Sequence, residues 1–328
     1  MKHLLILLTA AMGLVTCGNR PAAMPSQTQE PIFNADSAYR YIDDQVALGA
    51  RVPGTDAHTQ CILYIINHLK ACGMQINLQQ GTMTNYAGQP QAVYNILARL
   101  TTPQIESRKH LLLCAHYDSR PWCDEEELYE NRYLPVPAAN DGASGVGVLL
   151  EIARVLSDST HRANLTQPID FVFFDCEDMG TPSFYTGMQR EDTWCLGSQM
   201  WASEMVRQGH QGLYQYGILL DMVGAPDATF PKEYYSMQNA GDYVEKIWRV
   251  GNELGYGRYF QQQHAMPITD DHYYVNLLGG IPCVDIINYD ARQNTGFPAW
   301  WHTLQDDMRH IDKTTLQAVG STLLTVIK

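Results

Sequence analysis

Acidic residues and histidines follow several of the apolar runs in this sequence, at points where a strand should end. The apolar run FVFF at 171–174 leads directly into Asp175, Glu177 and Asp178. Unpaired carboxylates are costly to bury, so a positive charge should lie close to these three, and a bound cation is one source of it. The same pattern recurs along the chain, at His116, Asp118, Asp141, Asp221, Asp270, Asp271, His272 and His302.

These side chains offer only carboxylate oxygens and imidazole nitrogens as ligands, with no CxxC pair to suggest a cysteine site. Such a set suits Zn²⁺ in a catalytic site, where three protein ligands leave one coordination position open. Taken singly, each residue has a simpler explanation: Asp141 could cap a helix, and His116 could be an ordinary core or surface histidine. The convergence of several such residues on predicted strand ends favours a shared site.

Apolar runs that alternate with amphipathic segments predict the elements that position these residues. We predict strands at 94–100, 110–114, 169–174, 216–222 and 283–287. We predict helices over 38–46, 58–69, 142–156, 196–206, 242–254 and 313–327, with a further helix opening at Asp270. This alternation predicts an α/β fold, a three-layer sandwich whose mostly parallel central sheet is flanked by helices. Sites in such sheets form at the carboxyl ends of the strands.

The composition is that of a globular protein, with 45% hydrophobic and 17% charged residues in 328. The formal net charge is −13, and no basic stripe is visible. Phosphate recognition needs clustered lysine and arginine, so the sequence argues against nucleic acid as a partner.

The first residues, MKHLLILLTAAMGLVTCG, have the pattern of an export signal. Lys2 precedes an apolar stretch at 4–15 that is too short for an ordinary membrane span. The letters LVTC at 14–17 resemble a bacterial lipobox, although Thr16 stands where Gly, Ala or Ser is usual. Cys17 is therefore the candidate for a lipid anchor, and cleavage near residues 22–23 is the alternative.

The sequence divides into a signal peptide at 1–16, a flexible tether at 17–32 and a single catalytic domain at 33–328. We expect an exported, periplasmic protein that is anchored to a membrane as a lipoprotein. Seven cysteines follow Cys17, and an odd number leaves at least one unpaired.

Six segments carry a resemblance to a known family: CAHYDSR, NDGASGVGVLLEIAR, FVFFDCEDMG, GILLDMVGAP, TDDH and WWHT, in this order. Together they resemble the zinc-exopeptidase-like fold, and within it the glutaminyl-peptide cyclotransferases. The resemblance runs from about Phe33 to the C-terminus. It implies an enzyme that cyclises the N-terminal glutamine of peptides and proteins to pyroglutamate and releases ammonia.

The resemblance also implies one zinc ion per chain, held by Asp141, Asp178 and His302. Asp178 stands where animal relatives carry glutamate, and the missing methylene shortens the reach of this ligand.

The remaining implied roles concern proton transfer and the substrate pocket. Glu177 becomes the general base and acid, and Asp221 and Asp270 become hydrogen-bonded acids behind it. Trp301 lines the pocket. No second tryptophan directly follows Glu177 and Asp178, so Trp194 is the candidate for that place.

Two alternatives remain open from the sequence. A di-zinc aminopeptidase of the same fold would use five ligand positions, and all are filled here, by His116, Asp141, Asp178, Asp221 and His302. The segments GAPDATFP, TDDH and WWHT favour the cyclotransferases over this class. A binding ectodomain without catalysis is the second alternative, but such domains typically lose their ligands.

Overall fold

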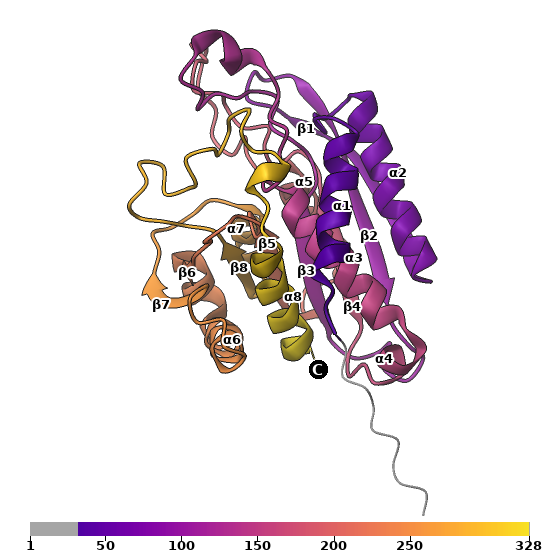
Figure 1. Ribbon diagram of the computed structural model, residues 1–328. Coiled ribbons are helices and arrows are strands. Elements are labelled where there is room, and N and C mark those ends of the chain that lie inside the picture. The colour runs from indigo at the N-terminus through magenta and orange to yellow at the C-terminus, as the bar shows by residue number, and fades with distance from the viewer. Residues whose placement is uncertain (1–31, 328) are drawn as a thin grey trace, which may run out of the picture. The chain divides into compact units, whose positions relative to one another are not determined.

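A central sheet organises residues 32–327, the part of the chain that this computed structural model describes. The sheet has six strands in the order β1-β2-β4-β3-β5-β8 (Figure 1). Their bounds are β1 Gln75–Thr84, β2 Pro90–Leu100, β3 His110–His116, β4 Ile169–Phe174, β5 Tyr214–Asp221 and β8 Cys283–Ile287. The predicted signal peptide, Cys17 and the tether up to residue 31 lie outside the described residues.

Four neighbouring strands of this sheet, β4, β3, β5 and β8, run parallel to one another. The other two, β1 and β2, form an antiparallel extension at the β4 edge. The predicted sheet, mostly parallel and flanked by helices, is thus confirmed, with an antiparallel pair that the sequence analysis did not foresee.

Helices cover both faces of the sheet. Their bounds are α1 Ala35–Ala47, α2 Asp56–Ala71, α3 Ala143–Ser157, α4 Ser159–Ala163, α5 Leu196–Arg207, α6 Tyr234–Glu253, α7 Asp271–Leu277 and α8 Lys313–Ile327. Side chains of α1, α2, α3, α6 and α8 form the larger core on one face, whereas α5 and α7 pack on the other (Figure 1). The short elements are strands β6 Phe230–Lys232 and β7 Phe260–His264, which pair with each other, and the 3₁₀ helices η1 Tyr129–Tyr133 and η2 Met308–His310.

The strand β4 shows why the apolar runs form this sheet. Phe171 and Phe173 point into the larger core, while Val172 and Phe174 point into the smaller one, and all four are fully buried. Full burial of one such side chain contributes about 1.5–3 kcal/mol, so a run without polar interruptions is stable only between two helical layers.

Within residues 32–327, no helix combines the length and the apolar character that crossing a membrane requires. All seven cysteines in this part of the chain are unpaired.

Candidate metal and substrate site

The carboxyl ends of the parallel strands meet at one edge of the sheet, and most of the predicted site residues lie there. His116 ends β3 and Asp221 ends β5, while Glu177 and Asp178 follow β4 by a short turn. Asp141 directly precedes the first turn of α3. Gly145 permits this placement, because a Cβ at that position would collide with the backbone of β5.

Asp141, Asp178 and His302 lie together, with ligand atoms within 4.8 Å of one another. His302 Nε2 is 3.1 Å from Asp178 Oδ1 and 3.5 Å from Asp141 Oδ2. All three side chains are buried, and Asp178 Oδ2 has no hydrogen-bond partner. A buried carboxylate oxygen without a partner is unfavourable unless a cation binds it.

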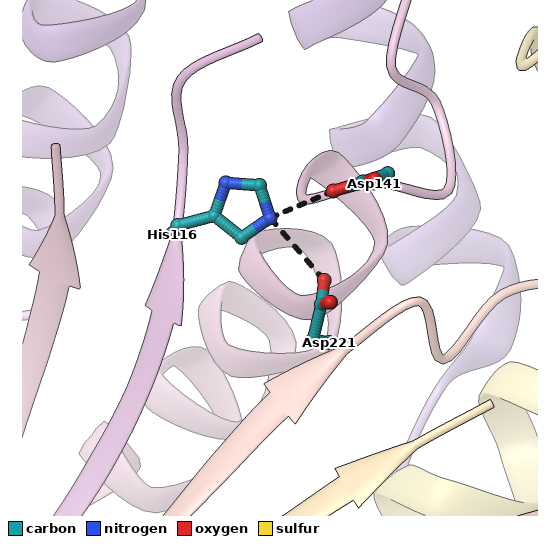
Figure 2. Close-up of side chains that lie close together, drawn as sticks. All are labelled: His116, Asp141 and Asp221. Atoms are coloured by element: carbon teal, nitrogen blue, oxygen red, sulfur yellow. Dashed lines mark hydrogen bonds and ion pairs between the residues drawn. The ribbon is translucent and has the colours of Figure 1, made fainter. Parts of the chain in front are cut away.

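His116, Asp141 and Asp221 form a second group that shares Asp141 with the first (Figure 2). His116 Nε2 lies 2.9 Å from Asp141 Oδ1 and 3.2 Å from Asp221 Oδ1. The imidazole fits because Gly142 lacks a Cβ, which would otherwise overlap the ring. Asp141 thus presents one oxygen to each of two histidines.

Two further carboxylates orient the backbone that carries these ligands. Asp118 accepts hydrogen bonds from the backbone N–H groups of Glu177, at 3.1 Å, and Asp178, at 3.2 Å. Asp306 accepts from the N–H groups of Asn140, at 2.8 Å, and Asp141, at 3.1 Å.

Arg120 connects the metal ligands with the aromatic wall. Its guanidinium donates two hydrogen bonds of 2.7 Å to Asp124, whose carboxylate lies 3.7 Å from His302 Nδ1. It also donates to the backbone carbonyl of Asp178 at 3.0 Å and lies 4.5 Å from the ring centre of Trp194. Arg120 therefore fixes one ligand, the partner of another ligand and one tryptophan.

The carboxylates around the two histidines favour their charged form over the neutral one. Burial opposes protonation of His116, but hydrogen bonds to Asp118, Asp141 and Asp221 outweigh it and raise its pKa well above the ordinary value. Burial likewise opposes protonation of His302, and the nearby carboxylate of Asp178 raises its pKa. The surplus of negative charge in the site explains both shifts.

The acids that line the cavity also have raised pKa values, which favour their neutral form. Burial raises the pKa of Glu177 well above its usual range, and the charge of Asp178 adds to this effect. Burial also raises the pKa of Asp270 to about 7, with a contribution from Asp221, and that of Asp221 to about 6, with a contribution from Asp141. The Cys195 thiol donates to Glu177 Oε1 at 3.1 Å. These carboxyls can therefore hold or release a proton near neutral pH.

A cavity of about 440 Å³ opens at this edge of the sheet. Its polar floor comprises Asp141, Glu177, Asp178, Asp221, Asp270 and His302. Apolar and aromatic side chains form the wall, namely Trp194, Met222, Met266, Ile268, Ile287, Tyr289, Phe297 and Trp301. His116 does not line the cavity.

Both predicted pocket tryptophans line this cavity, and both rings lie roughly parallel to that of His302. The Trp301 ring centre lies 3.6 Å from that of His302 with the planes 21° apart, and the Trp194 ring centre lies 6.2 Å away with planes 7° apart. Trp300 instead stacks on His310 at 4.3 Å and packs against the larger core, so it is no part of the wall.

The structure thus brings together the predicted zinc ligands, acids and pocket tryptophans, whose individual roles stay predictions. Asp175 instead pairs with His58 at 2.8 Å and His272 with Glu233 at 3.0 Å, and neither Asp175 nor His272 lines the cavity. The sequence analysis assigned no role to Arg120, Asp124, Cys195 or Asp306. Arg120 stands in the motif CAHYDSR and Asp306 lies four residues after His302, so proximity to motifs was the available signal. Their partners, however, are distant in sequence, by 58 residues for Arg120 and Asp178 and by 165 for Asp306 and Asp141.

Comparisons with known proteins agree with this geometry. The model of Peptidase family M28 matches residues 95–327. The crystal structure of Tannerella forsythia glutaminyl cyclase is 46% identical, with a TM-score of 0.83 over 90% of this chain and 99% of that one. A Zn-dependent exopeptidase from Parabacteroides distasonis is 45% identical, with a TM-score of 0.84 over 90% of this chain and 98% of that one. The glutaminyl-peptide cyclotransferase of Bos taurus is 25% identical over 83% of this chain and 75% of its own length.

Proposed function

This chain belongs to peptidase family M28, and we propose that it is a zinc-dependent glutaminyl-peptide cyclotransferase. It converts the N-terminal glutamine of peptides and proteins to pyroglutamate and releases ammonia. The observation that carries this proposal is the cavity that Glu177, the group Asp141, Asp178 and His302, and two indoles line together. The relatives named glutaminyl cyclase support the same activity.

The residues present fit one zinc ion per chain. Asp141, Asp178 and His302 would hold it, because their donor atoms converge and the unpartnered Asp178 Oδ2 calls for a cation. When bound, zinc would act as a Lewis acid on the γ-carbonyl oxygen of the glutamine. All three residues line the cavity, so a substrate that enters it would reach a metal held there.

Glu177 is the general base and acid of this reaction. The α-amine of the substrate attacks its own γ-amide carbon, and Glu177 takes a proton from that amine. The same carboxyl then delivers a proton to the leaving nitrogen, which departs as ammonia, so the protein ends as it began. Its raised pKa suits both steps, and such assistance is typically worth ~10²–10⁴-fold in rate.

Asp270 and Asp221 line the same floor and carry raised pKa values. Asp270 and Glu177 have carboxylate oxygens within 4.8 Å of each other. Carboxyls this close share protons rather than ionise together, which keeps the proton on Glu177 available.

Trp194 and Trp301 hold the glutamine folded and keep water out. Both indoles lie against His302, so their faces border the position of the γ-amide. Water is the competing nucleophile for an activated amide, and a dry pocket favours the internal amine.

The di-zinc aminopeptidase differs from this proposal in its second metal. The group His116, Asp141 and Asp221 has the donor atoms for one. His116, however, does not line the cavity, whereas Asp141, Asp178 and His302 all do.

Two assays on the purified protein test the proposal. Incubation with a Gln-peptide should release ammonia, and mass spectrometry should show the corresponding loss of mass. Incubation with the matched Ala-peptide should leave it uncleaved. Removal of the N-terminal alanine would support the aminopeptidase instead.

We further propose that the protein is exported and anchored to a membrane through a lipid on Cys17, with a periplasmic catalytic domain. The apolar N-terminal stretch and the lipobox-like letters at 14–17 support this. Wild-type protein should partition into the membrane fraction and Cys17→Ser should not. Equal partition of the two would remove the lipid anchor from the proposal and leave export standing.

A further inference from the structure

A segment beside the cavity carries exposed aromatic rings and glutamates that the proposed reaction does not use. We define the outer surface as Glu125, Glu127, Tyr129, Glu130 and Tyr133. The two tyrosines are 60% and 51% exposed, and all three glutamates are exposed. Tyr129 and Tyr133 pack edge to face with ring centres 5.5 Å apart. Exposed rings of this size are typical of binding surfaces.

The glutamates of the outer surface have no cationic partner. Among residues 32–327, no lysine, arginine or histidine forms an ion pair with Glu125, Glu127 or Glu130. The nearby Arg132 donates to the backbone carbonyl of Glu126 at 2.7 Å instead. Three exposed carboxylates in six residues therefore present unbalanced negative charge to a ligand.

Backbone contacts place this segment directly behind a predicted metal ligand. The N–H of Glu125 donates to the carbonyl of His302 at 3.3 Å. The carboxylate of Glu126 accepts from the N–H of Leu304 at 2.9 Å. The outer surface thus begins at the segment that carries both His302 and Trp301.

A continuous series of aromatic contacts also joins the cavity wall to the outer surface. The guanidinium of Arg120 lies 4.5 Å from the ring centre of Trp194 and 5.6 Å from that of Trp122. Trp122 contacts Phe184 with ring centres 6.4 Å apart, and Phe184 contacts Tyr133 at 4.6 Å. These contacts connect the Trp194 side of the cavity with the outer surface.

We propose that the outer surface binds the part of the substrate polypeptide that follows its N-terminal glutamine, and that it selects basic and aromatic residues there. This inference rests on the proposed cyclisation and adds the substrate class. The cavity has a volume of about 440 Å³, so most of a polypeptide substrate must lie outside it. An extended chain advances about 3.3 Å per residue, and a few residues suffice to reach the surface around the cavity.

The chemistry of the outer surface fits such a segment. Lysine and arginine side chains pair with the three glutamates, and they also interact favourably with the faces of Tyr129 and Tyr133. The net charge of −13 adds long-range attraction for cationic peptides.

The test compares three substrates: a Gln-Ala dipeptide amide, a longer Gln-peptide with lysines and one aromatic residue after the glutamine, and the same peptide with glutamates for lysines. In wild-type protein, kcat/KM should be about tenfold higher for the lysine peptide than for the glutamate peptide at low salt. The difference should shrink at about 0.5 M salt, because exposed charges are then screened.

The variant Glu127→Lys/Glu130→Lys should reverse this preference and leave dipeptide turnover within about twofold of wild type. The matched control Asp43→Lys/Glu253→Lys reverses two exposed acids on α1 and α6 and should keep the wild-type preference. Tyr129→Ala/Tyr133→Ala should raise KM for the lysine peptide alone.

Equal turnover of the lysine and glutamate peptides by wild type would overturn the inference. Reversal of the wild-type preference for the lysine peptide in the control variant would also overturn it. Both outcomes presuppose that the dipeptide is cyclised. If no ammonia is released from the dipeptide, the proposed function itself fails.

Discussion

The two sides of the Asp141 carboxylate differ in what surrounds them. On the side of His302, the group faces the cavity, and Asp178 keeps an oxygen without a partner. On the side of His116, the imidazole is closed off from the cavity and lies between the carboxylates of Asp118, Asp141 and Asp221. The same carboxylate therefore belongs to one open group and one closed group.

This difference shows that two groups with similar ligands can have different functions, one in metal binding and one in charge balance. The open group lines the cavity and keeps a carboxylate oxygen without a partner, which are conditions that suit a catalytic metal. The closed group supplies its own positive charge through His116, whose pKa its acidic neighbours raise. A protonated imidazole there balances the carboxylates as a second metal ion would.

Removing a ligand of the open group should have the largest effect. His302→Ala should abolish zinc binding and lower kcat/KM by about 10³-fold or more, since a metal contributes several kcal/mol to such a reaction. Elemental analysis of the purified variant measures zinc content alongside activity.

His116→Ala is the matched change in the closed group. It should keep about one zinc per chain, because His116 is not among the proposed ligands. If wild-type protein contains two zinc ions per chain and this variant loses one of them, the closed group also binds metal. That result would favour the aminopeptidase.

Glu177→Gln should have the next largest effect. It preserves shape and removes the base, so kcat should fall by about 10²-fold while zinc content stays unchanged. Steady-state kinetics with a Gln-peptide measure this. Near-normal kcat would transfer the proton-carrying role to another acid of the floor, such as Asp270.

Trp301→Ala should lower kcat/KM by ~10-fold, about 1.4 kcal/mol, mainly through a higher KM and with zinc retained. Trp300→Ala is the matched control, because Trp300 stacks on His310 outside the cavity. If zinc content falls in parallel with activity in Trp301→Ala, the indole supports His302 and does not bind substrate.

The smallest effect concerns Asp306, which serves both groups by holding the backbone of Asp141. Burial raises its pKa to about 7, so the folded state binds a proton that the unfolded state has lost above about pH 4. Its contribution to stability is present at low pH and is lost as pH rises through about 7.

In metal-free protein, Asp306→Asn should therefore flatten the fall in unfolding free energy between about pH 4 and 7, by at most ~1.4 kcal/mol per pH unit. Denaturant titrations across this range measure the slope. An unchanged slope would show that Asp306 ionises as freely in the folded protein as in the unfolded one.

Much of the fold could be predicted because its elements have strong local signals. The bounds of β4, β8 and α8 agree with the sequence prediction, since each is an apolar segment with clear ends. The strand β1 was missed. Its sequence, QINLQQGTMT, lies at the edge of the sheet, half exposed, and polar residues there carry little periodic signal.

The general location of the site could be predicted, because acidic residues and histidines gather at the ends of the predicted strands. Asp141, Asp178 and His302 were grouped because their segments resemble a family, and the structure places them together. The roles of Arg120 and Asp306 could not be predicted in this way, because each depends on a partner that only the folded chain brings near.

The hydrogen bonds of Asp306 to the start of α3 have a consequence for how the protein is made. Asp306, which holds the backbone of Asp141, is synthesised 165 residues after it, and His302, which completes the site, also comes long after Asp141. Domains generally fold as units during synthesis, so this one needs its distant segments together before the site is complete. The nascent chain can therefore form its central strands without a finished metal site, and a chain that stops short of residue 302 lacks one altogether.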